Sequence, residues 1–357
     1  MTPKERSPEI VDTHAEGEEL PLAPLLVREP LAAFLDEHGI GSGPVRAERI
    51  GDGHSNVTFR VERDGATVVV RRPPRPPLPK SAHDVLREAR LLAALGGSDV
   101  PVPEVLARGE DEAVIGAPFY VMEHVDGVVV TAETPAALAG ERGAIASGLL
   151  DALVALHAVD WEARGLGDFG RPSGYLERQV KRFAGLWEAG RTRELPALDA
   201  VTEWLGAHVP ESPTATIVHG DYRLGNLLLG AEPPARVLAV LDWEMATLGD
   251  PLADLGYLAA SWTAPGEPDT PMHELSGATR EPGWPSREEL VEAYGERTGH
   301  PVSELDWYRV LALWKSAIFL EQSYKRYLSG AEEDPWFEHM AGGVPALVED
   351  ARRLTGT

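Results

Sequence analysis

The sequence predicts an α+β fold in two lobes, a smaller β-rich lobe at residues 25–124 and a larger, mostly helical lobe at residues 125–357. Alternating apolar and polar residues with glycine-containing turns, which are typical of strands, are concentrated in the first lobe. Apolar residues spaced by three and four, which are typical of helices, dominate the second lobe, and short apolar runs between them predict a β-hairpin. The length of 357 residues suits two such lobes, since single domains typically have about 100–200 residues.

The first 24 residues are rich in Pro and Glu and show little periodicity, so we expect a flexible tail there. The first predicted element is a short helix from Leu25 to His38, which Gly39 ends. The segment GSGP at residues 41–44 then predicts a break in regular structure.

A β-hairpin is the clearest feature of the first lobe. The segment VTFRV at residues 57–61 alternates apolar and polar side chains, which is the period of a half-buried strand. The dipeptide Asp64-Gly65 predicts a tight turn, and residues 67–70 form the returning strand. The segment GDGHSN at residues 51–56 opens the hairpin as a turn, where glycine lets backbone N–H groups approach a ligand closely.

The rest of the first lobe predicts a helix and two more strands. We expect Arg72, after the hairpin, to be a strand-end charge in water. A helix is predicted from Ser81 to Leu95, where its apolar stripe ends at a pair of glycines. Residues 105–108 and 119–124 predict the two strands, so the lobe is expected to be a small antiparallel sheet with one main helix.

The second lobe is predicted to be mostly helical. Four apolar residues at spacings of four, three and four indicate one helix, from Leu176 to Trp187. Ser286 and Glu289 form a capping box that opens another helix, because each side chain can bond the backbone N–H of the other residue. A long helix is predicted over residues 304–328.

One stretch of the second lobe, residues 217–258, carries the candidate chemistry. Two short apolar runs in it predict buried strands, and they lead into Asp221 and Asp242. Asn226 lies between these two acids, five positions after the first of them. An Asp, an Asn and a second Asp held at strand ends can position a hydroxyl group and one or two Mg²⁺ ions for phosphoryl transfer.

Two motifs in this stretch resemble the aminoglycoside phosphotransferase family, the small-molecule branch of the protein-kinase-like fold. They are HGDYRLGN at residues 219–226 and VLDWEMATLGDPLADLGYL at residues 240–258. The resemblance covers nearly the whole chain, and residues 68–95 are most similar to the phosphotransferase half fused to some acyl-CoA dehydrogenases. It implies a bilobal protein-kinase-like fold, with a nucleotide-binding first lobe and with the catalytic loop and acceptor site in the second.

The resemblance also implies a role for each matching residue. Asp221 is the expected catalytic residue, which accepts the proton of the substrate hydroxyl, and Asn226 and Asp242 are the expected Mg²⁺ ligands beside ATP. Arg71 stands at the phosphate-contacting position in place of the usual Lys, with Glu88 as its partner. The other expected nucleotide contacts are Met122, Glu123 and Val125 at the adenine, and Gly51, Asp52, Gly53, His54, Ser55 and Asn56 in the phosphate loop.

Three further residues of the motifs are expected to be structural. His219 and Asp254 match positions that brace the catalytic loop, and Asp250 precedes Pro251 at the start of the following helix. The phosphate loop departs from the full GxGxxG pattern, because Asn56 stands where the third glycine would fall.

Composition excludes several other classes of protein. The formal charge of −24 argues against nucleic-acid binding, which needs a basic surface. The chain has no Cys, no Gly-Lys pair and no H-E-x-x-H, and residues 53–57 fail the G-x-S-x-G pattern, which excludes cysteine nucleophiles, P-loop kinases, zinc proteases and serine hydrolases. The N-terminus lacks the apolar core of a signal peptide and no apolar run is long enough for a membrane span, so we expect a cytoplasmic protein without a membrane partner.

The sequence does not decide which compound accepts the phosphate group. A hydroxylated acyl-CoA or a related metabolite is favoured by the similarity of residues 68–95. An aminoglycoside or another antibiotic is favoured by the family name and by the acidic charge, which attracts cations. A nucleotide-binding pseudokinase is motivated by Arg71 alone, and the retention of Asp221 with both expected metal ligands argues against it.

Overall fold

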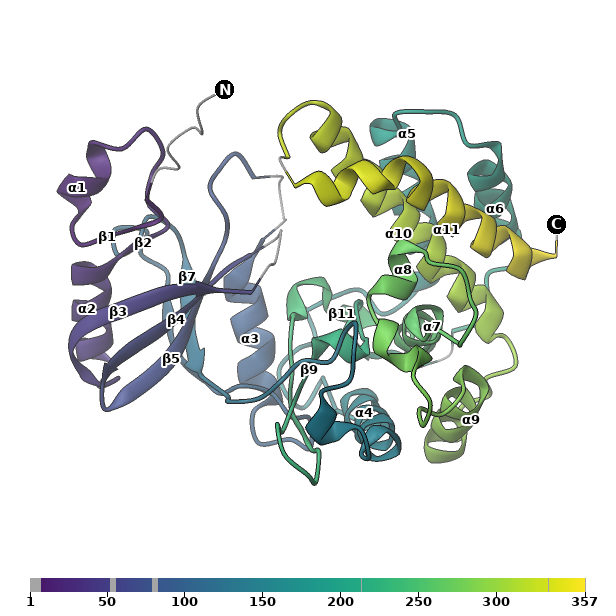
Figure 1. Ribbon diagram of the computed structural model, residues 1–357, viewed down its shortest axis with the longest axis horizontal. Coiled ribbons are helices and arrows are strands. Elements are labelled where there is room, and N and C mark those ends of the chain that lie inside the picture. The colour runs from purple at the N-terminus through teal and green to yellow at the C-terminus, as the bar shows by residue number, and fades with distance from the viewer. Residues whose placement is uncertain (1–7, 52–55, 79–82, 213, 333, 357) are drawn as a thin grey trace. The chain divides into compact units, whose positions relative to one another are not determined.

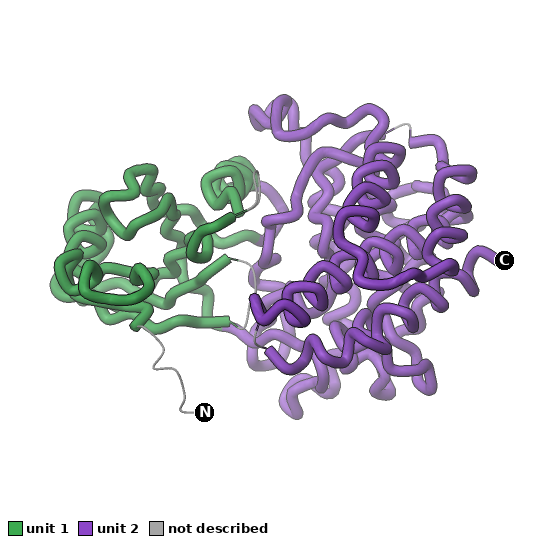
Figure 2. Tube along the Cα trace, turned by 90° about the horizontal axis from the view of Figure 1, so that it is seen from above, with its two compact units in different colours: residues 1–96, 102–126 green, residues 97–101, 127–357 purple. Residues whose placement is uncertain are grey.

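The computed structural model describes residues 8–51, 56–78, 83–212, 214–332 and 334–356. The chain divides into two compact units, which Figure 2 shows in separate colours. Unit 1 comprises residues 1–96 and 102–126, and unit 2 comprises residues 97–101 and 127–357. The predicted α+β class is confirmed, because unit 1 is built around a sheet and unit 2 is built of helices with short strands.

The sheet of unit 1 is antiparallel and consists of β3 (Ser42–Ile50), β4 (Val57–Asp64), β5 (Ala66–Arg72), β6 (Val105–Gly109) and β7 (Phe119–Glu123). The spatial order is β3-β4-β5-β7-β6 (Figure 1). The predicted hairpin is present as β4 and β5, with Gly65 at a φ of +82° between them. Alternation buries Val57, Phe59 and Val61 on one face of β4, as their spacing predicts.

Two helices pack against this sheet. α2 (Arg28–Glu37) contacts β3, and α3 (Val85–Leu95) contacts β6 and β7. α3 begins later than the predicted Ser81, because the side chain of Asp84 caps it by accepting from the backbone N–H of Arg87 at 3.0 Å.

Residues 8–24 contain regular elements where the sequence predicted a flexible tail. β1 (Ile10–Val11) pairs in parallel with β2 (Leu26–Val27), and α1 (His14–Glu18) lies between them in the chain. Leu25 and Leu26 are buried in the core of unit 1, and the carbonyl oxygen of Glu9 accepts from both of their backbone N–H groups. Burial of this anchor explains why a stretch of tail-like composition is ordered.

Arg72 is buried, so the expectation of a strand-end charge in water is wrong. Its side chain is 2% exposed and donates to the carbonyl oxygens of Pro73, Leu25 and Ile115 at 2.7–2.9 Å. Residues 68, 70 and 72 share the core-facing side of β5, so the alternation of the strand itself carries the guanidinium inward. Burial lowers the pKa of Arg72 to about 10.

Unit 2 is organised around the long helix α10 (Leu305–Leu328), which packs against α7 (Leu252–Ser261), α5 (Tyr175–Gly190) and α11 (Met340–Thr355). The predicted capping box is confirmed at the start of α9 (Arg287–Thr298). The side chain of Ser286 accepts from the backbone N–H of Glu289, and the side chain of Glu289 accepts from the backbone N–H of Ser286. The other α-helices in the described part of unit 2 are α4 (Arg142–His157), α6 (Pro196–Ala207) and α8 (Pro271–Glu274).

The strands of unit 2 form two separate pairs. β9 (Leu227–Leu229) forms a hairpin with β10 (Val237–Val240), whereas β8 (Thr216–Val218) pairs with β11 (Thr247–Gly249). The two apolar runs that lead into the candidate acids therefore do not pair with each other. No helix in the described part of the chain is long and apolar enough to cross a membrane.

Candidate active site

The loop after β8 brings Asp221 and Asn226 together. A single helical turn, η2 (Leu224–Asn226), returns the chain so that the side-chain nitrogen of Asn226 donates to the backbone oxygen of Asp221 at 2.7 Å and to its carboxylate at 2.8 Å. The side chain of Asp221 is 22% exposed. Both bonds use the amide nitrogen of Asn226, so its amide oxygen stays available to a ligand, with no donor bonded to it among the described residues.

Asp242 lies beside Asn226 at the open end of the β9–β10 hairpin, because Asn226 directly precedes β9 and Asp242 follows shortly after β10. The backbone N–H of Leu241 donates to the carbonyl oxygen of Asn226 at 2.8 Å, so the two expected metal ligands occupy neighbouring ends of paired strands. Asp242 has a φ of +67° and a ψ of +61°, in the left-handed region. Such a conformation costs a non-glycine residue about 1–3 kcal/mol and is concentrated at functional sites.

Asp254 fixes the loop that carries Asp221. Its buried carboxylate accepts from the backbone N–H groups of His219 and Gly220 at 2.7 and 2.8 Å, and it lies 3.2 Å from His157 Nε2. Gly220 has a φ of +87°, and a Cβ there would lie 2.9 Å from the carbonyl oxygen of Met245. Asp254 thus forms short hydrogen bonds to the backbone just before Asp221, in keeping with the bracing role expected of it.

His219 and Asp250 also have the geometry of structural residues. His219 Nε2 donates to the carbonyl oxygen of Leu241 at 2.9 Å, which ties the loop of Asp221 to the strand that precedes Asp242. The carboxylate of Asp250 accepts from the hydroxyl of Tyr308 at 2.9 Å and from the backbone N–H of Leu252 at 2.8 Å. Both residues connect the elements that carry the candidate site.

Arg223 lies next to Asp221, and the sequence analysis missed it. Its Nε is 3.4 Å from the Asp221 carboxylate, and its side chain is largely buried. The only signal for it in the sequence is its position two residues after Asp221 within the HGDYRLGN motif.

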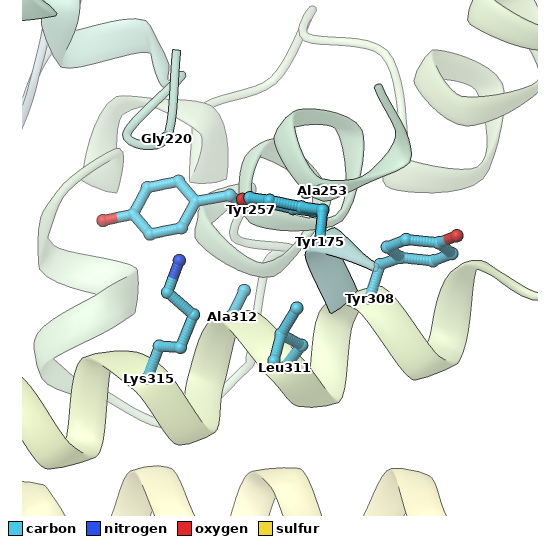
Figure 3. A pocket seen from close by; sticks show the side chains of 8 residues that line it. All are labelled: Tyr175, Gly220, Ala253, Tyr257, Tyr308, Leu311, Ala312 and Lys315. Carbon is cyan, nitrogen blue, oxygen red and sulfur yellow. The ribbon is translucent and has the colours of Figure 1, made fainter. Parts of the chain in front are cut away.

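Tyr257 and Lys315 are two further neighbours that the sequence analysis did not assign. Figure 3 shows Lys315 extending from α10 toward the ring of Tyr257 and the loop at Gly220. Burial, together with the negative charge of Asp221, raises the pKa of Tyr257 well above its ordinary value of 10. Burial also lowers the pKa of Lys315 to about 8, although Asp254 and Asp221 partly oppose this shift.

In unit 1 the structure brings Arg71 and Glu88 together as expected. Arg71 Nε donates to the carboxylate of Glu88 at 3.1 Å, and its Nη1 donates to the hydroxyl of Thr58 at 3.3 Å. Glu88 is 3% exposed, so this pair is screened from water and holds the Arg71 guanidinium in a defined place at the end of β5.

The other expected nucleotide residues are only partly within the described chain. Asp52, Gly53, His54 and Ser55 lie outside the described residues. Of the rest of that loop, Gly51 has a φ of +76° and Asn56 is buried, with its side-chain oxygen 3.2 Å from His83 Nδ1. Met122 and Glu123 end β7, where they pair with Val69 and Val68, and Val125 follows as a half-buried residue.

The donor set around Asp221 fits a magnesium ion held jointly with a nucleotide. No group of three or more His, Cys, Asp or Glu residues with the geometry of a metal site occurs in the part of the chain that the structure describes. Mg²⁺ is usually bound through one or two protein oxygens together with substrate phosphates and water. The amide oxygen of Asn226 and the carboxylate of Asp242 supply such a pair.

Comparison with known proteins identifies the family of the chain. The profile of the phosphotransferase enzyme family, APH, matches residues 46–290, which is more than half of the chain. The chain belongs to this family. Family membership confirms the resemblance drawn from the two motifs, the kinase-like α+β fold and the expected class of enzyme, a phosphotransferase for small molecules.

The chain is similar to part of longer proteins. Acyl-CoA dehydrogenase family member 10 of Mus musculus is 35% identical over 302 residues, which are 84% of this chain and 28% of that protein. The chain thus spans little more than a quarter of that relative.

Solved structures cover the chain more fully. A crystal structure of a provisionally assigned aminoglycoside phosphotransferase from Ralstonia eutropha is 34% identical, with a TM-score of 0.77 over 92% of this chain and 98% of that one. A mutant of aminoglycoside phosphotransferase APH(4)-Ia, in complex with AMP-PNP and hygromycin B, is 17% identical, with a TM-score of 0.60 over 91% and 98%. At that identity the second structure shows a shared fold alone.

Proposed function

We propose that the chain is an ATP- and Mg²⁺-dependent phosphotransferase that moves the γ-phosphate of ATP to a hydroxyl group of a small molecule. The main support for the proposal is that hydrogen bonds hold three oxygen-bearing side chains close together. Asn226 bonds Asp221 directly, and the β9–β10 pairing holds Asp242 beside Asn226. These are the residue types that the reaction needs, in one place.

Asp221 is the proposed catalytic residue, and its task is to accept the proton of the acceptor hydroxyl. The acceptor oxygen then forms a bond to the γ-phosphorus while the bond from that phosphorus to the bridging oxygen of ADP breaks. The products are ADP and the phosphorylated acceptor. The bonds from Asp254 to the backbone before Asp221 keep its carboxylate in position without any rearrangement during the reaction.

Asn226 and Asp242 are the proposed residues for holding Mg²⁺. A bound Mg²⁺ supplies positive charge that neutralises the phosphate oxygens during transfer. Arg223 lies close to Asp221, and its guanidinium adds a protein-derived positive charge where negative charge develops.

Unit 1 is the proposed nucleotide-binding lobe, and unit 2 is the proposed lobe for catalysis and acceptor binding. Glu88 holds Arg71 in place through the bond at 3.1 Å, and Arg71 is the residue proposed to contact the phosphate oxygens. The loop from Gly51 to Asn56 is proposed to cover the phosphates. The proposed adenine site uses the side chain of Met122, the carbonyl oxygen of Glu123 and the N–H of Val125.

The proposed acceptor is a hydroxyacyl-CoA-like metabolite. Support comes from the similarity to a chain that carries an acyl-CoA dehydrogenase name, since an enzyme fused to such a protein would share its class of substrate. An antibiotic acceptor is the alternative, supported by the hygromycin B complex of a protein with the same fold. A nucleotide-binding pseudokinase is the alternative of another class.

The test is ADP release from Mg·ATP with a panel of hydroxyacyl-CoAs, aminoglycosides and macrolides. Asp221→Asn removes the proton acceptor with little change of shape, and we expect it to lower kcat by roughly 10²–10⁴-fold while ATP binding stays intact. Glu232→Gln, an exposed carboxylate in the connection between β9 and β10, is the matched control and should leave kcat unchanged. Activity that persists in Asp221→Asn would refute the mechanism, and tight ATP binding without turnover on any acceptor would favour the pseudokinase.

A further inference from the structure

A second cavity in unit 2 is formed by residues that the proposed phosphotransfer does not use. Its walls include the C-terminal ends of α7 and α11 and the first half of α10, and its volume is about 170 Å³. Of the described residues that line it, none lines the pocket beside Gly220 or belongs to the proposed phosphotransfer site. A cavity of roughly 150 Å³ can hold a molecule of the size of benzene, so this one can hold a small organic molecule.

Two residues that line this cavity carry buried polar atoms without a partner. Arg309 Nε and Asp350 Oδ2 are buried, and neither makes a hydrogen bond to any residue that the structure describes. The rest of each side chain is bound, because Arg309 Nη1 donates to Asp306 at 2.9 Å and the other oxygen of Asp350 accepts from Arg353. A buried donor or acceptor without a bond costs free energy, so a ligand that accepts from Arg309 and donates to Asp350 would stabilise both.

The other polar walls of the cavity are already satisfied. Arg287 donates to the two carboxylate oxygens of Glu267 at 2.9 and 2.8 Å and to two backbone carbonyl oxygens. Burial lowers the pKa of His273 from its ordinary value of 6.5, so the ring is neutral at pH 7, and its Nδ1 donates to a backbone carbonyl oxygen at 2.8 Å. The open positions are therefore those of Arg309 and Asp350.

Positive and negative charges around the cavity balance. Arginines at or beside it each pair with an acid: Arg287 with Glu267, Arg309 with Asp306, Arg353 with Asp350, and Arg280 with Asp269. Arg280 is included because its charge acts on His273, which lines the cavity. A net charge on the ligand would be left uncompensated here, so a molecule with both charges or with none fits best.

Apolar side chains form the remaining wall. They belong to Ala260, Pro268, Leu313 and Leu354. Leu313 lies one helical turn after Arg309 on α10, and Leu354 lies one turn after Asp350 on α11. The two helices thus present an apolar side chain next to each open polar atom, and the ligand needs an apolar group as well as its two polar ones.

We propose that this cavity binds a free amino acid with an apolar side chain. Its carboxylate accepts from Arg309 Nε, its ammonium group donates to Asp350 Oδ2, and its side chain packs against Leu313 and Leu354. Hydrogen bonds between charged groups are stronger than those between neutral ones, which favours a zwitterion over a neutral alcohol or amide. The site is separate from the proposed phosphotransfer site, and its occupancy does not depend on that reaction.

Isothermal titration calorimetry of the full chain tests this site. The zwitterions titrated first are L-valine, L-leucine and L-phenylalanine. The one that binds most tightly is then compared with its two analogues, one without the ammonium group and one without the carboxylate, which for leucine are 4-methylpentanoate and 3-methylbutylamine. The variants are Asp350→Asn and Arg309→Gln, with Glu349→Gln as the matched control, because Glu349 lies on the same helix and pairs with Arg352 at 2.7 Å.

We expect the amino acid to bind the wild type and Glu349→Gln equally. Loss of a hydrogen bond to a charged group lowers affinity roughly ten- to hundredfold, so each analogue and each cavity variant should show a loss of that size. The losses should not add where ligand and protein lack the same bond. In Asp350→Asn, removal of the ammonium group should therefore lower affinity by less than about threefold, and the same should hold for the carboxylate in Arg309→Gln.

Three outcomes would overturn the inference. The first is that none of the three amino acids binds the wild type at millimolar concentration, in which case ordered water satisfies both buried atoms. The second is that both analogues bind as tightly as the amino acid. The third is that Asp350→Asn weakens the amino acid and the analogue without the ammonium group equally, which would be an effect on the fold. If a cavity variant does not fold, as circular dichroism would show, the analogue series on the wild type decides.

Discussion

Replacing Lys315 by Met should stabilise unit 2 at neutral pH, because the folded protein holds this ammonium group away from water without a counter-charge. Burial lowers its pKa from the ordinary value of 10.5 to about 8, a difference of 10.5 − 8 = 2.5. Each pKa unit corresponds to 1.36 kcal/mol, so the upper bound is about 3 kcal/mol. The side chain is only half-buried and the Phe183 ring attracts the charge, so we expect a gain of about 1–2 kcal/mol.

The gain in stability from Lys315→Met should depend on pH in a definite direction. Below pH 8 the lysine is protonated in both the folded and the unfolded chain, and the full cost of burying the charge is present. Between pH 8 and 10.5 the unfolded chain binds more protons than the folded one, so this contribution to the stability of the wild type rises with pH. The advantage of Lys315→Met should therefore be largest below pH 8 and should disappear by about pH 10.5.

Urea unfolding followed by tryptophan fluorescence measures the effect in the right unit, because all nine tryptophans of the chain lie in unit 2. The quantity compared is the difference in unfolding free energy between Lys315→Met and the wild type at each pH, which cancels the titration of shared groups. Lys325→Met is the control for removal of a surface charge. The reasoning is refuted if Lys315→Met is no more stable than the wild type at pH 7, or if its advantage does not shrink toward pH 10.5.

Three further predictions follow from contacts in the two units. Asp254→Asn turns amide hydrogens toward two backbone donors, so it should cost about 2–3 kcal/mol of stability and lower kcat, as urea unfolding and ADP release would measure. Gly256→Ala places a Cβ 2.4 Å from Tyr308 Cβ, and overpacking of this kind should cost about 1–3 kcal/mol or more. Glu88→Gln weakens the hold on Arg71, so the KM of ATP should rise about tenfold with the acceptor KM unchanged.

Each of these predictions has a clear contradicting result. Wild-type stability and kcat in Asp254→Asn would mean that its backbone bonds do not fix the loop. An unchanged urea midpoint in Gly256→Ala would mean that α7 and α10 can separate at no cost. A rise in the acceptor KM of Glu88→Gln equal to that of ATP would show that the pair acts on the whole fold and not on the nucleotide.

The sequence was sufficient to predict the elements with a strong period or a clear turn. The β4–β5 hairpin, the capping box and the strands β8 and β10 were all predicted from local patterns. β3 was missed, because it is an edge strand whose residues are mostly exposed and begin within a glycine-rich break. β9 and β11 have three residues each, and strands so short leave no periodicity to detect.

Local sequence patterns did not predict which charged side chains are buried. The partners of Arg72 come from carbonyl groups more than forty positions away, so nothing near it in the sequence marks it as buried. Nothing in the local sequence marks Lys315, because its pocket exists only where α7 and the loop of Gly220 fold against α10. Asp221, Asn226 and Asp242 were found because each follows or precedes a short apolar run within residues 217–258.

The close crossing of α7 and α10 has a consequence for regioselectivity. Gly256 brings the two helix backbones so near that no larger side chain fits against Tyr308, which fixes their spacing. The first turn of α7 carries Asp254, whose bonds hold the loop of the proposed base, and α10 carries Lys315. Because this crossing fixes α10 relative to the loop that carries the proposed base, we expect the proposed transfer to phosphorylate a single hydroxyl of the acceptor.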